Sequence, residues 1–342
     1  MRCEVTIGIP VFQANDYIRE TMLSALAQSY ADVEFLIVDD CGADGSMTVV
    51  EELQETHPRG GSIRILRHPE NKGVGASRNQ IIREARGKYL YFMDSDDMIE
   101  SDTIERLMAA MRQHEADVVY ASYEKIDTIN HTPTEQFQYP TLSFTSNVEF
   151  ASYVFSHYGK FQVSVCNCLL SLDFLRCHHL TFVDAMFWED MAFTYDMALK
   201  VQKAALLPDI TYHYICRPNS LSHYQDRDIL CREEILKNVS TMDYLKRKCG
   251  NMGLRPYLPD LCYNLQMNSF YIVCHVLKHR RRITPPISDE ELRTFMRHPL
   301  LLHDVLRFRH RRIVSLILWL LPLCPLPVFK VLVRMMGRIK KI

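Results

Sequence analysis

The chain has 342 residues, with 40 Lys and Arg against 41 Asp and Glu, so its formal net charge is −1. Apolar residues make up 47% and charged residues 24%, a balance that is typical of globular proteins and excludes disordered or collagen-like chains. At about 100–200 residues per domain, the length predicts two domains or one large domain with an extension.

The first half alternates predicted strands and helices. Strands are predicted over Val5–Pro10, Glu34–Asp39, Ser62–Arg67, Tyr89–Met93 and Asp117–Ala121. Helices are predicted after Asn15 or Asp16, from Ser46 to about Thr56, over Ala76–Ala85 and around Ile104–Met111. In the first helix, Ile18, Met22, Leu23 and Leu26 are expected on one buried stripe. This order predicts an α/β fold with a mostly parallel, Rossmann-like sheet and helices on both faces.

Acidic side chains directly follow two of the predicted strands. Asp39 and Asp40 end one strand, and Asp94, Asp96 and Asp97 follow another. Ligands of open parallel sheets bind at the carboxyl ends of the strands, so both clusters are expected at one edge. Mg²⁺ or Mn²⁺ beside a phosphate would offset the repulsion among three carboxylates. Alternatively, residues 94–97 cap the helix that follows.

Two further motifs carry charge. The segment Asn71–Asn79 contains Gly73 and Gly75, and its Arg78 is placed to reach a diphosphate or an acidic partner; the alternative is a glycine turn with a surface Arg. The segment 187–190 sets a pair of carboxylates beside aromatic residues, surroundings that suit a general base. The alternative for this pair is an acidic helix N-terminus.

These motifs occur in an order that is typical of one family. The segments Val5–Phe12, Val38–Ser46, Asn71–Asn79 and Asp94–Asp97 together resemble the family 2 glycosyltransferases, which have a GT-A fold. The resemblance covers residues 3–125 well and extends more weakly to about residue 225. The chain departs from the usual pattern at Phe12-Gln13, where Tyr-Asn is common, and at Cys41-Gly42-Ala43.

For the donor, the resemblance implies specific roles. Asp40 matches the position that reads the uracil edge, and Pro10 and Phe12 match the wall beside that base. Asp94 matches a position near the ribose, and Ser95 is grouped with the nucleotide-sugar-binding residues. Arg78 matches the arginine that organises this acidic site.

For the chemical step, the resemblance implies that Asp96 binds Mg²⁺ or Mn²⁺ on the diphosphate. It also implies that Asp190, supported by Glu189, is the base that takes the proton of the acceptor hydroxyl. Arg217 lies in a Tyr-His-Tyr-Ile-Cys-Arg segment and would offset the charge of the departing diphosphate. The alternative for Arg217 is a surface position in a loop.

The C-terminal part has a different composition. Residues 276–342 contain fifteen Lys and Arg against four Asp and Glu, and residues 313–329 carry no charge. This uncharged run is shorter than the roughly 20 residues of a spanning helix and contains three prolines. We expect it to lie in a membrane interface, with its basic flanks near anionic headgroups. The alternatives are a buried helix pair with a solvated basic face and a membrane span.

The sequence as a whole predicts a GT-A catalytic domain over residues 1–225, a helical extension over 226–300 and a membrane-associating tail over 301–342. The expected activity is inverting, metal-dependent transfer of a sugar from a nucleotide sugar, a UDP-sugar, to a hydroxyl of a glycan or lipid-linked acceptor. The process would be cell-surface polysaccharide synthesis, by an enzyme in the cytoplasm, peripheral on the inner face of the membrane.

Two alternatives remain open. A degenerate, non-catalytic membrane assembly partner would retain the same motifs without activity. A nucleotidyltransferase would want a basic glycine-rich loop where this chain has residues 10–13, Pro-Val-Phe-Gln. No nucleic-acid partner is expected, because the basic residues follow an apolar segment and lack interleaved aromatic residues for stacking.

Overall fold

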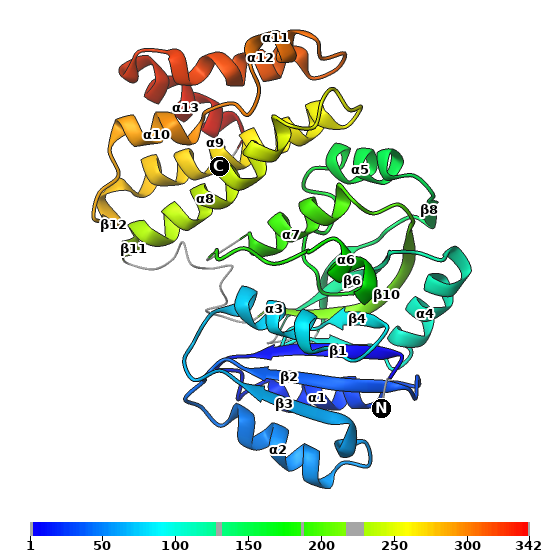
Figure 1. Ribbon diagram of the computed structural model, residues 1–342. Coiled ribbons are helices and arrows are strands. Elements are labelled where there is room, and N and C mark those ends of the chain that lie inside the picture. Colours follow the sequence, from blue (N-terminus) through cyan, green and yellow to red (C-terminus); the bar gives the residue numbers. More distant parts are fainter. Residues whose placement is uncertain (1–2, 128–131, 186–187, 217–228, 341–342) are drawn as a thin grey trace. The chain divides into compact units, whose positions relative to one another are not determined.

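The computed structural model describes residues 3–127, 132–185, 188–216 and 229–340. They belong to two compact units that alternate along the chain (Figure 1). The first unit comprises residues 1–150, 163–182 and 197–220, and the second comprises 151–162, 183–196 and 221–342. The predicted three-part division of the chain stays a prediction.

The first unit is built on a curled sheet with the strand order β3-β2-β1-β4-β9-β6-β10-β5, with β7 beside β6 and β8 beside β10. The strands are β1 (Val5–Val11), β2 (Val33–Asp39), β3 (Ile63–Arg67), β4 (Tyr89–Phe92), β5 (Met98–Ile99), β6 (Val118–Asp127), β7 (Pro133–Phe137), β8 (Leu142–Phe144), β9 (Cys168–Ser171) and β10 (Ala204–Cys216). The neighbours β3, β2, β1 and β4 are parallel, as are β6 and β10. The predicted mostly parallel α/β sheet is therefore confirmed.

The strand β9 was not predicted from the sequence. It runs antiparallel between β4 and β6 and joins the two parallel groups of strands. Its four residues, Cys-Leu-Leu-Ser, are too few to show a periodicity of two. The sheet thus depends on a pairing that local sequence does not reveal.

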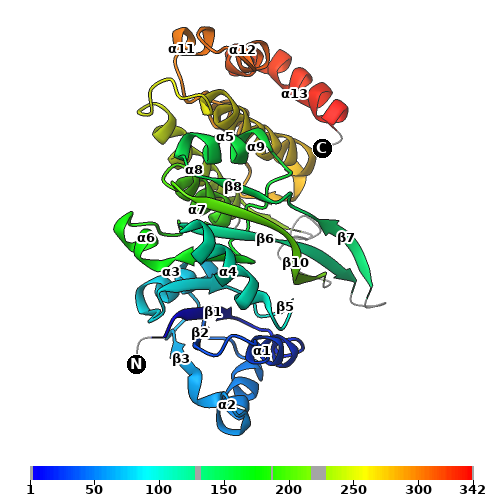
Figure 2. The ribbon, with the colours of Figure 1, turned by 90° about the vertical axis from the view of Figure 1, so that its right-hand side faces the viewer.

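The helices of the first unit are α1 (Ile18–Leu26), α2 (Ser46–Thr56), α3 (Val74–Glu84), α4 (Thr103–His114) and α6 (Leu172–Cys177). Figure 2 shows α1 and α3 on opposite sides of strands β1–β4, as predicted. In α1, Ile18, Met22 and Leu26 are buried, but Leu23 is 42% exposed. The prediction for Leu23 was wrong because it lies about 100° around the helix from Met22, outside the buried stripe.

The position of α3 depends on a glycine in β1. A Cβ atom on Gly8 would lie 2.4 Å from Cγ2 of Ile81, which is closer than real Cβ contacts allow. The absence of a side chain at Gly8 therefore lets α3 lie close against β1. This helix carries Arg78 and places it beside the ends of the central strands.

The second unit is mainly helical. It contains α8 (Arg232–Cys249), α9 (Leu258–His279), α10 (Asp289–Phe295), α11 (Leu302–Leu306), α12 (Arg312–Leu320), α13 (Leu326–Lys340) and a short pair of strands, β11 (Leu230–Cys231) and β12 (Ile283–Thr284). Two helices, α5 (Asn147–Ser156) and α7 (Glu189–Ala198), contribute residues to both units. Among the helices of the described ranges, none combines the length and the apolar character needed to cross a membrane.

Candidate active site

Loops that follow adjacent strands meet at one edge of the first unit's sheet. The strands β3, β2, β1 and β4 are parallel neighbours, so their carboxyl ends lie together. The register places Pro10 beside Val38, and the backbone NH of Asp40 donates to the carbonyl of Val11 over 2.9 Å. The acidic clusters after β2 and β4 therefore share the edge at which such sheets bind ligands.

Asp40 is buried, and its carboxylate holds the loop that follows β3. Oδ1 accepts a hydrogen bond from the backbone NH of Lys72 over 2.8 Å, and Oδ2 accepts one from Gly73 over 2.8 Å. Oδ1 also lies 2.6 Å from Nδ1 of His68. Gly73 has a φ of +85°, which side chains rarely tolerate, and it immediately precedes α3. The carboxylate thus fixes the turn into α3, and its Oδ2 retains a second lone pair for a ligand donor.

Arg78 contacts the acidic cluster that follows β4. It lies on α3 with only 3% of its surface exposed, and its Nη2 donates to Oδ1 of Asp94 over 2.9 Å. The guanidinium also lies 5.5 Å from the centre of the Phe182 ring. Arg78 is therefore a buried residue that orients Asp94, and not the surface residue of the alternative interpretation.

The turn after β4 is anchored by a buried aspartate. Oδ2 of Asp97 accepts a hydrogen bond from the hydroxyl of Tyr212 over 2.6 Å, and Oδ1 accepts one from the backbone NH of Ile215 over 2.8 Å. The Tyr212 hydroxyl also accepts from the backbone NH of Asp94 over 3.2 Å. Burial, together with the charges of Asp96 and Asp94, raises the pKa of Asp97 well above its usual value. Strand β10 thus holds both ends of the turn.

The other two residues of this turn have different surroundings. Ser95 is buried, and its carbonyl accepts a hydrogen bond from the hydroxyl of Thr21 on α1 over 3.1 Å. Asp96 is partly exposed. Helix α4 begins later, at Thr103, with Asp102 as its N-cap residue. Residues 94–97 therefore do not cap that helix, which excludes the alternative interpretation of this acidic cluster as a helix cap.

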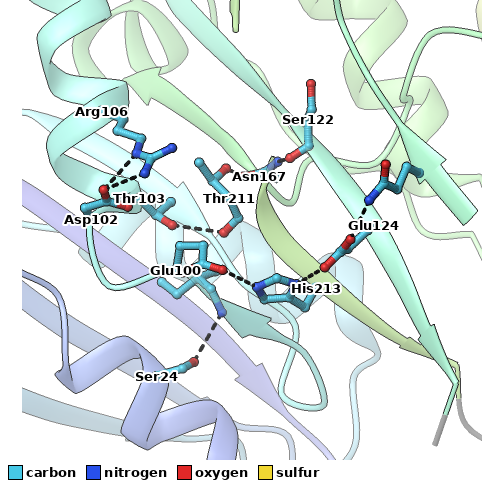
Figure 3. Close-up of polar contacts among 12 residues, drawn as sticks. Ser24, Glu100, Asp102, Thr103, Arg106, Ser122, Glu124, Asn167, Thr211 and His213 are labelled. Atoms are coloured by element: carbon cyan, nitrogen blue, oxygen red, sulfur yellow. Dashed lines mark hydrogen bonds and ion pairs between the residues drawn. The ribbon is translucent and has the colours of Figure 1, made fainter. Parts of the chain in front are cut away.

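A polar network fixes β10 where it supports this turn (Figure 3). His213 lies between two carboxylates, with Nδ1 3.0 Å from Oε1 of Glu124 and Nε2 2.9 Å from Oε1 of Glu100. The hydroxyl of Thr211 donates to Oδ1 of Asn167 over 2.7 Å. Sequence reasoning missed these supporting roles, since the only signal was the Tyr-His-Tyr segment before Arg217. The residues on both sides of Tyr212 are thus held in place.

The first strand ends in an exposed aromatic side chain. Phe12 is 42% exposed at the same edge of the sheet. Two of the positions that depart from the usual family pattern, Gln13 and Cys41, have φ values of +50° and +59°. Both therefore adopt the left-handed conformation that turns at ligand sites often require, although neither is glycine or asparagine.

The oxygens of the 94–97 turn suit a shared cation better than a closed metal site. Both oxygens of Asp97 accept hydrogen bonds from β10, and Oδ1 of Asp94 accepts one from Arg78. In the described ranges, no group of three or more His, Cys, Asp or Glu side chains is arranged to hold a metal ion. The turn therefore fits a cation that would share its coordination with phosphate oxygens and water, as Mg²⁺ often does.

Glu189 and Asp190 are the first two residues of α7 and belong to the second unit. Glu189 is buried and Asp190 is partly exposed. Trp188, directly before them, has a φ of +68°, a conformation that costs a bulky residue about 1–3 kcal/mol and that occurs at functional sites. The predicted site residue Arg217 lies outside the described residues.

The helix that carries this pair is anchored within the second unit. The hydroxyl of Tyr244 donates to Oδ2 of Asp196 over 2.5 Å, and Nζ of Lys248 lies 2.5 Å from Oδ1 of the same carboxylate. The amide of Asn268 on α9 donates to the sulfur of Met191 over 3.0 Å. These contacts with α8 and α9 restrain both ends of α7.

Both the sequence and the fold are similar to those of known proteins. The sequence model described as glycosyl transferase family 2 matches residues 6–169. TuaG of Bacillus subtilis (strain 168), a protein named provisionally as a teichuronic acid biosynthesis glycosyltransferase, is 30% identical over 141 residues, which are 41% of this chain and 54% of TuaG. The chain thus spans about half the length of the first curated relatives that it matches.

Two solved structures resemble the chain over most of its length. TarS residues 1–349 of S. aureus, crystallised with UDP-GlcNAc, has a TM-score of 0.63 at 15% identity and covers 93% of this chain and 90% of that one. The mannosyltransferase PcManGT of Pyrobaculum calidifontis, in complex with GDP-Man and Mn²⁺, has a TM-score of 0.55 at 15% identity and covers 94% and 86%. At these identities the likeness shows the GT-A fold.

Proposed function

Residues 6–169 of this chain form a domain of glycosyl transferase family 2, and on this premise we propose that the chain transfers a sugar from a UDP-sugar to an acceptor hydroxyl. The observation that carries the proposal is the cluster at the edge of the sheet. There Asp40, Arg78 and the turn at residues 94–97 are held together by α3 and β10. Such a cluster offers carboxylates and an exposed ring to a nucleotide that carries a diphosphate.

The base of the nucleotide would bind between the ends of β1 and β2. The exposed ring of Phe12, two residues after Pro10 of β1, offers an apolar surface for stacking. The second lone pair of Asp40 Oδ2 would accept the imino NH of uracil. Asp94 and Ser95, which follow the neighbouring strand β4, would lie along the ribose. A solved structure with the same fold contains UDP-GlcNAc, which supports a uridine nucleotide as the donor.

Mg²⁺ or Mn²⁺ would be held by Asp96 together with the diphosphate. When bound, the cation would supply positive charge that stabilises the departing nucleoside diphosphate. Burial and the charges of Asp96 and Asp94 raise the pKa of the Asp97 carboxyl, and a cation at this turn would offset the repulsion among the three groups. A structural neighbour was crystallised with Mn²⁺, which supports a divalent cation in this fold.

Asp190 would act as the general base, with Glu189 as a supporting group. An inverting transfer needs one carboxylate that takes the proton of the acceptor hydroxyl while its oxygen attacks the anomeric carbon. The restrained helix α7 and the strained backbone of Trp188 support a functional role for this pair. Arg217 would offset charge on the leaving diphosphate.

The acceptor would be a glycan or a lipid-linked saccharide in cell-surface polysaccharide synthesis. The relative TuaG is named for the synthesis of teichuronic acid, which supports this process. The basic, apolar C-terminal tail supports a location in the cytoplasm, peripheral on the inner face of the cell membrane.

The test is a panel of nucleotide sugars offered to the purified protein with Mn²⁺ or with EDTA. We expect release of UDP from one donor, lost with EDTA and in Asp96→Asn. The matched control is Asp102→Asn, which changes an exposed aspartate outside the cluster. If no nucleotide sugar in the panel shows metal-dependent binding, the proposed donor site is wrong.

A second variant separates binding from chemistry. Asp190→Asn should abolish transfer and leave UDP affinity unchanged, whereas Asp184→Asn, at a largely exposed surface position, should change neither. Transfer at the normal rate by Asp190→Asn would remove this residue as the base. Donor binding by the unaltered chain without transfer to any acceptor would favour the non-catalytic alternative.

A further inference from the structure

The exposed apolar residues of this protein are concentrated at its C-terminus. Of the 17 large hydrophobic side chains that are exposed in the described ranges, eleven lie between residues 301 and 339. These eleven are Leu301, Leu302, Leu306, Ile313, Ile317, Leu320, Leu323, Val328, Val331, Met335 and Ile339. So dense a group within 39 residues is unlike the scattered exposure of ordinary protein surfaces.

The helices that carry most of these residues are well packed on their other side. Helices α12 and α13 both contact α9 (Figures 1 and 2). Leu318, Phe329 and Val333 are completely buried, and a Cβ on Gly337 would lie 3.1 Å from Sγ of Cys274. Nζ of Lys330 lies 2.7 Å from Oδ2 of Asp289 on α10. The exposed side is therefore the outer face of an ordered helix pair.

The exposed residues of α13 form a continuous stripe. Val328, Val331, Met335 and Ile339 are spaced by three, four and four residues, which places them along one face of the helix. Exposed basic residues follow beside this stripe, at Arg334, Arg338 and Lys340. An apolar face bordered by basic side chains is the arrangement of helices that lie in a membrane interface.

The charged residues of α12 and α13 themselves all have one sign. After Asp304 the sequence contains nine Lys and Arg and no Asp or Glu. In the described part of the chain, Arg307, Arg309, Arg334 and Arg338 form no ion pair with an acidic side chain. These cations are thus available to an external anionic surface, and each would gain from anionic lipid headgroups.

From this geometry we propose that the outer face of α12 and α13 (the α12–α13 face) docks on the surface of an anionic lipid bilayer. The exposed residues Ile313, Ile317, Val331, Met335 and Ile339 enter the boundary between headgroups and acyl chains. The neighbouring arginines contact the phosphates. A second copy of the chain fits this face poorly, because a symmetric contact would set the same basic patches against each other.

The biological role of this membrane docking rests on the proposed function: docking would bring the enzyme to a lipid-linked acceptor. The structural evidence for docking is independent of that function, because the exposed residues of α12 and α13 do not include Asp40, Arg78 or the turn at residues 94–97. Vesicle binding and donor binding are therefore measured separately. Loss of one with retention of the other tells which of the two proposals fails.

The experiment is co-sedimentation of the full chain with lipid vesicles. The vesicles consist of phosphatidylcholine alone or of phosphatidylcholine with about 30% phosphatidylglycerol. We expect binding to the anionic vesicles only, weakened by high salt. The variant Ile317→Gln/Val331→Gln/Met335→Gln should bind at least tenfold more weakly. The control Ile229→Gln/Leu254→Gln removes exposed apolar residues elsewhere in the second unit and should bind normally.

A charge variant tests the second component. Arg334→Gln/Arg338→Gln should lose most of the preference for phosphatidylglycerol, whereas Arg255→Gln, at another exposed arginine, should keep it. Circular dichroism confirms that each variant is folded. Wild-type protein that binds neither vesicle, or apolar variants that bind as well as the wild type, would overturn the proposal. So would variants that instead dissociate a protein oligomer in vesicle-free solution, since the face would then be a protein interface.

Discussion

The hydroxyl of Tyr212 provides a sharp test of how the proposed nucleotide site is held. It donates to the buried carboxylate of Asp97 and accepts from the backbone NH of Asp94, so Tyr212→Phe removes both contacts and one oxygen atom. Tyr91→Phe is a matched control. Tyr91 is also completely buried, but its hydroxyl makes a single 3.3 Å hydrogen bond, to Oδ1 of Asn167 and not to a residue of the turn.

The expected magnitudes follow from these contacts. A hydrogen bond to a charged group contributes about 1.5–3 kcal/mol and a neutral one about 0.5–1.5 kcal/mol. Tyr212→Phe should therefore lower the free energy of unfolding by about 2–4 kcal/mol, and Tyr91→Phe by about 1 kcal/mol. If about 1.4 kcal/mol of the loss comes from disorder of the 94–97 turn that nucleotide binding must reverse, the affinity for UDP with Mn²⁺ falls about tenfold.

The assay combines urea unfolding, followed by circular dichroism, with titration of UDP in the presence of Mn²⁺. Tyr212→Phe should change both quantities, whereas Tyr91→Phe should change only the first, and by less. Equal losses of stability in the two variants, or an unchanged nucleotide affinity in Tyr212→Phe, would refute the view that β10 holds the turn.

Three further predictions concern other parts of the molecule. Gly8→Ala should lower the free energy of unfolding by about 1–3 kcal/mol because its Cβ would press on Ile81, whereas Gly61→Ala, with no atom within 4 Å, should change urea unfolding little. Asp40→Ala should weaken UDP binding in the same titration, because the turn at Lys72 and Gly73 loses its acceptor; normal affinity would remove Asp40 from the site. Burial lowers the pKa of His298 to about 4, below its unfolded value of about 6.5, so its contribution to stability is present above pH 6.5 and is lost as the pH falls towards 4. His298→Phe should flatten this part of the pH dependence of thermal unfolding, and His303→Gln, at an exposed position, should not.

The local pattern of the sequence predicted the framework of the first unit. The apolar runs at Val5–Pro10 and Glu34–Asp39 correspond to β1 and β2. The same strand predictions placed the acidic residues at the carboxyl ends of β2 and β4. These features are local, since a strand is recorded in consecutive residues and a parallel sheet brings strand ends together. The roles of Asp40 in nucleotide binding, of Asp96 in metal binding and of Asp190 as the general base stay predictions.

The contacts that stabilise the site were not predictable in the same way. Tyr212 and Asp97 are 115 residues apart, and His213 pairs with carboxylates 89 and 113 residues away. No periodicity records such distant partners. The uncharged run at 313–329 likewise indicated an apolar surface, but which of its residues are exposed depends on how α12 and α13 pack on α9.

The link between Asp97 and Tyr212 also affects how the chain is made. A ribosome adds about 5–20 residues per second, so about 6–23 s separate the synthesis of Asp97 from that of Tyr212. During that interval the nascent turn carries three carboxylates without the strand that supports them. The segment that matches the family, residues 6–169, is complete well before β10 exists. The cluster of Asp40, Arg78 and the turn at residues 94–97 therefore cannot reach its final form on the nascent chain until translation has passed residue 216.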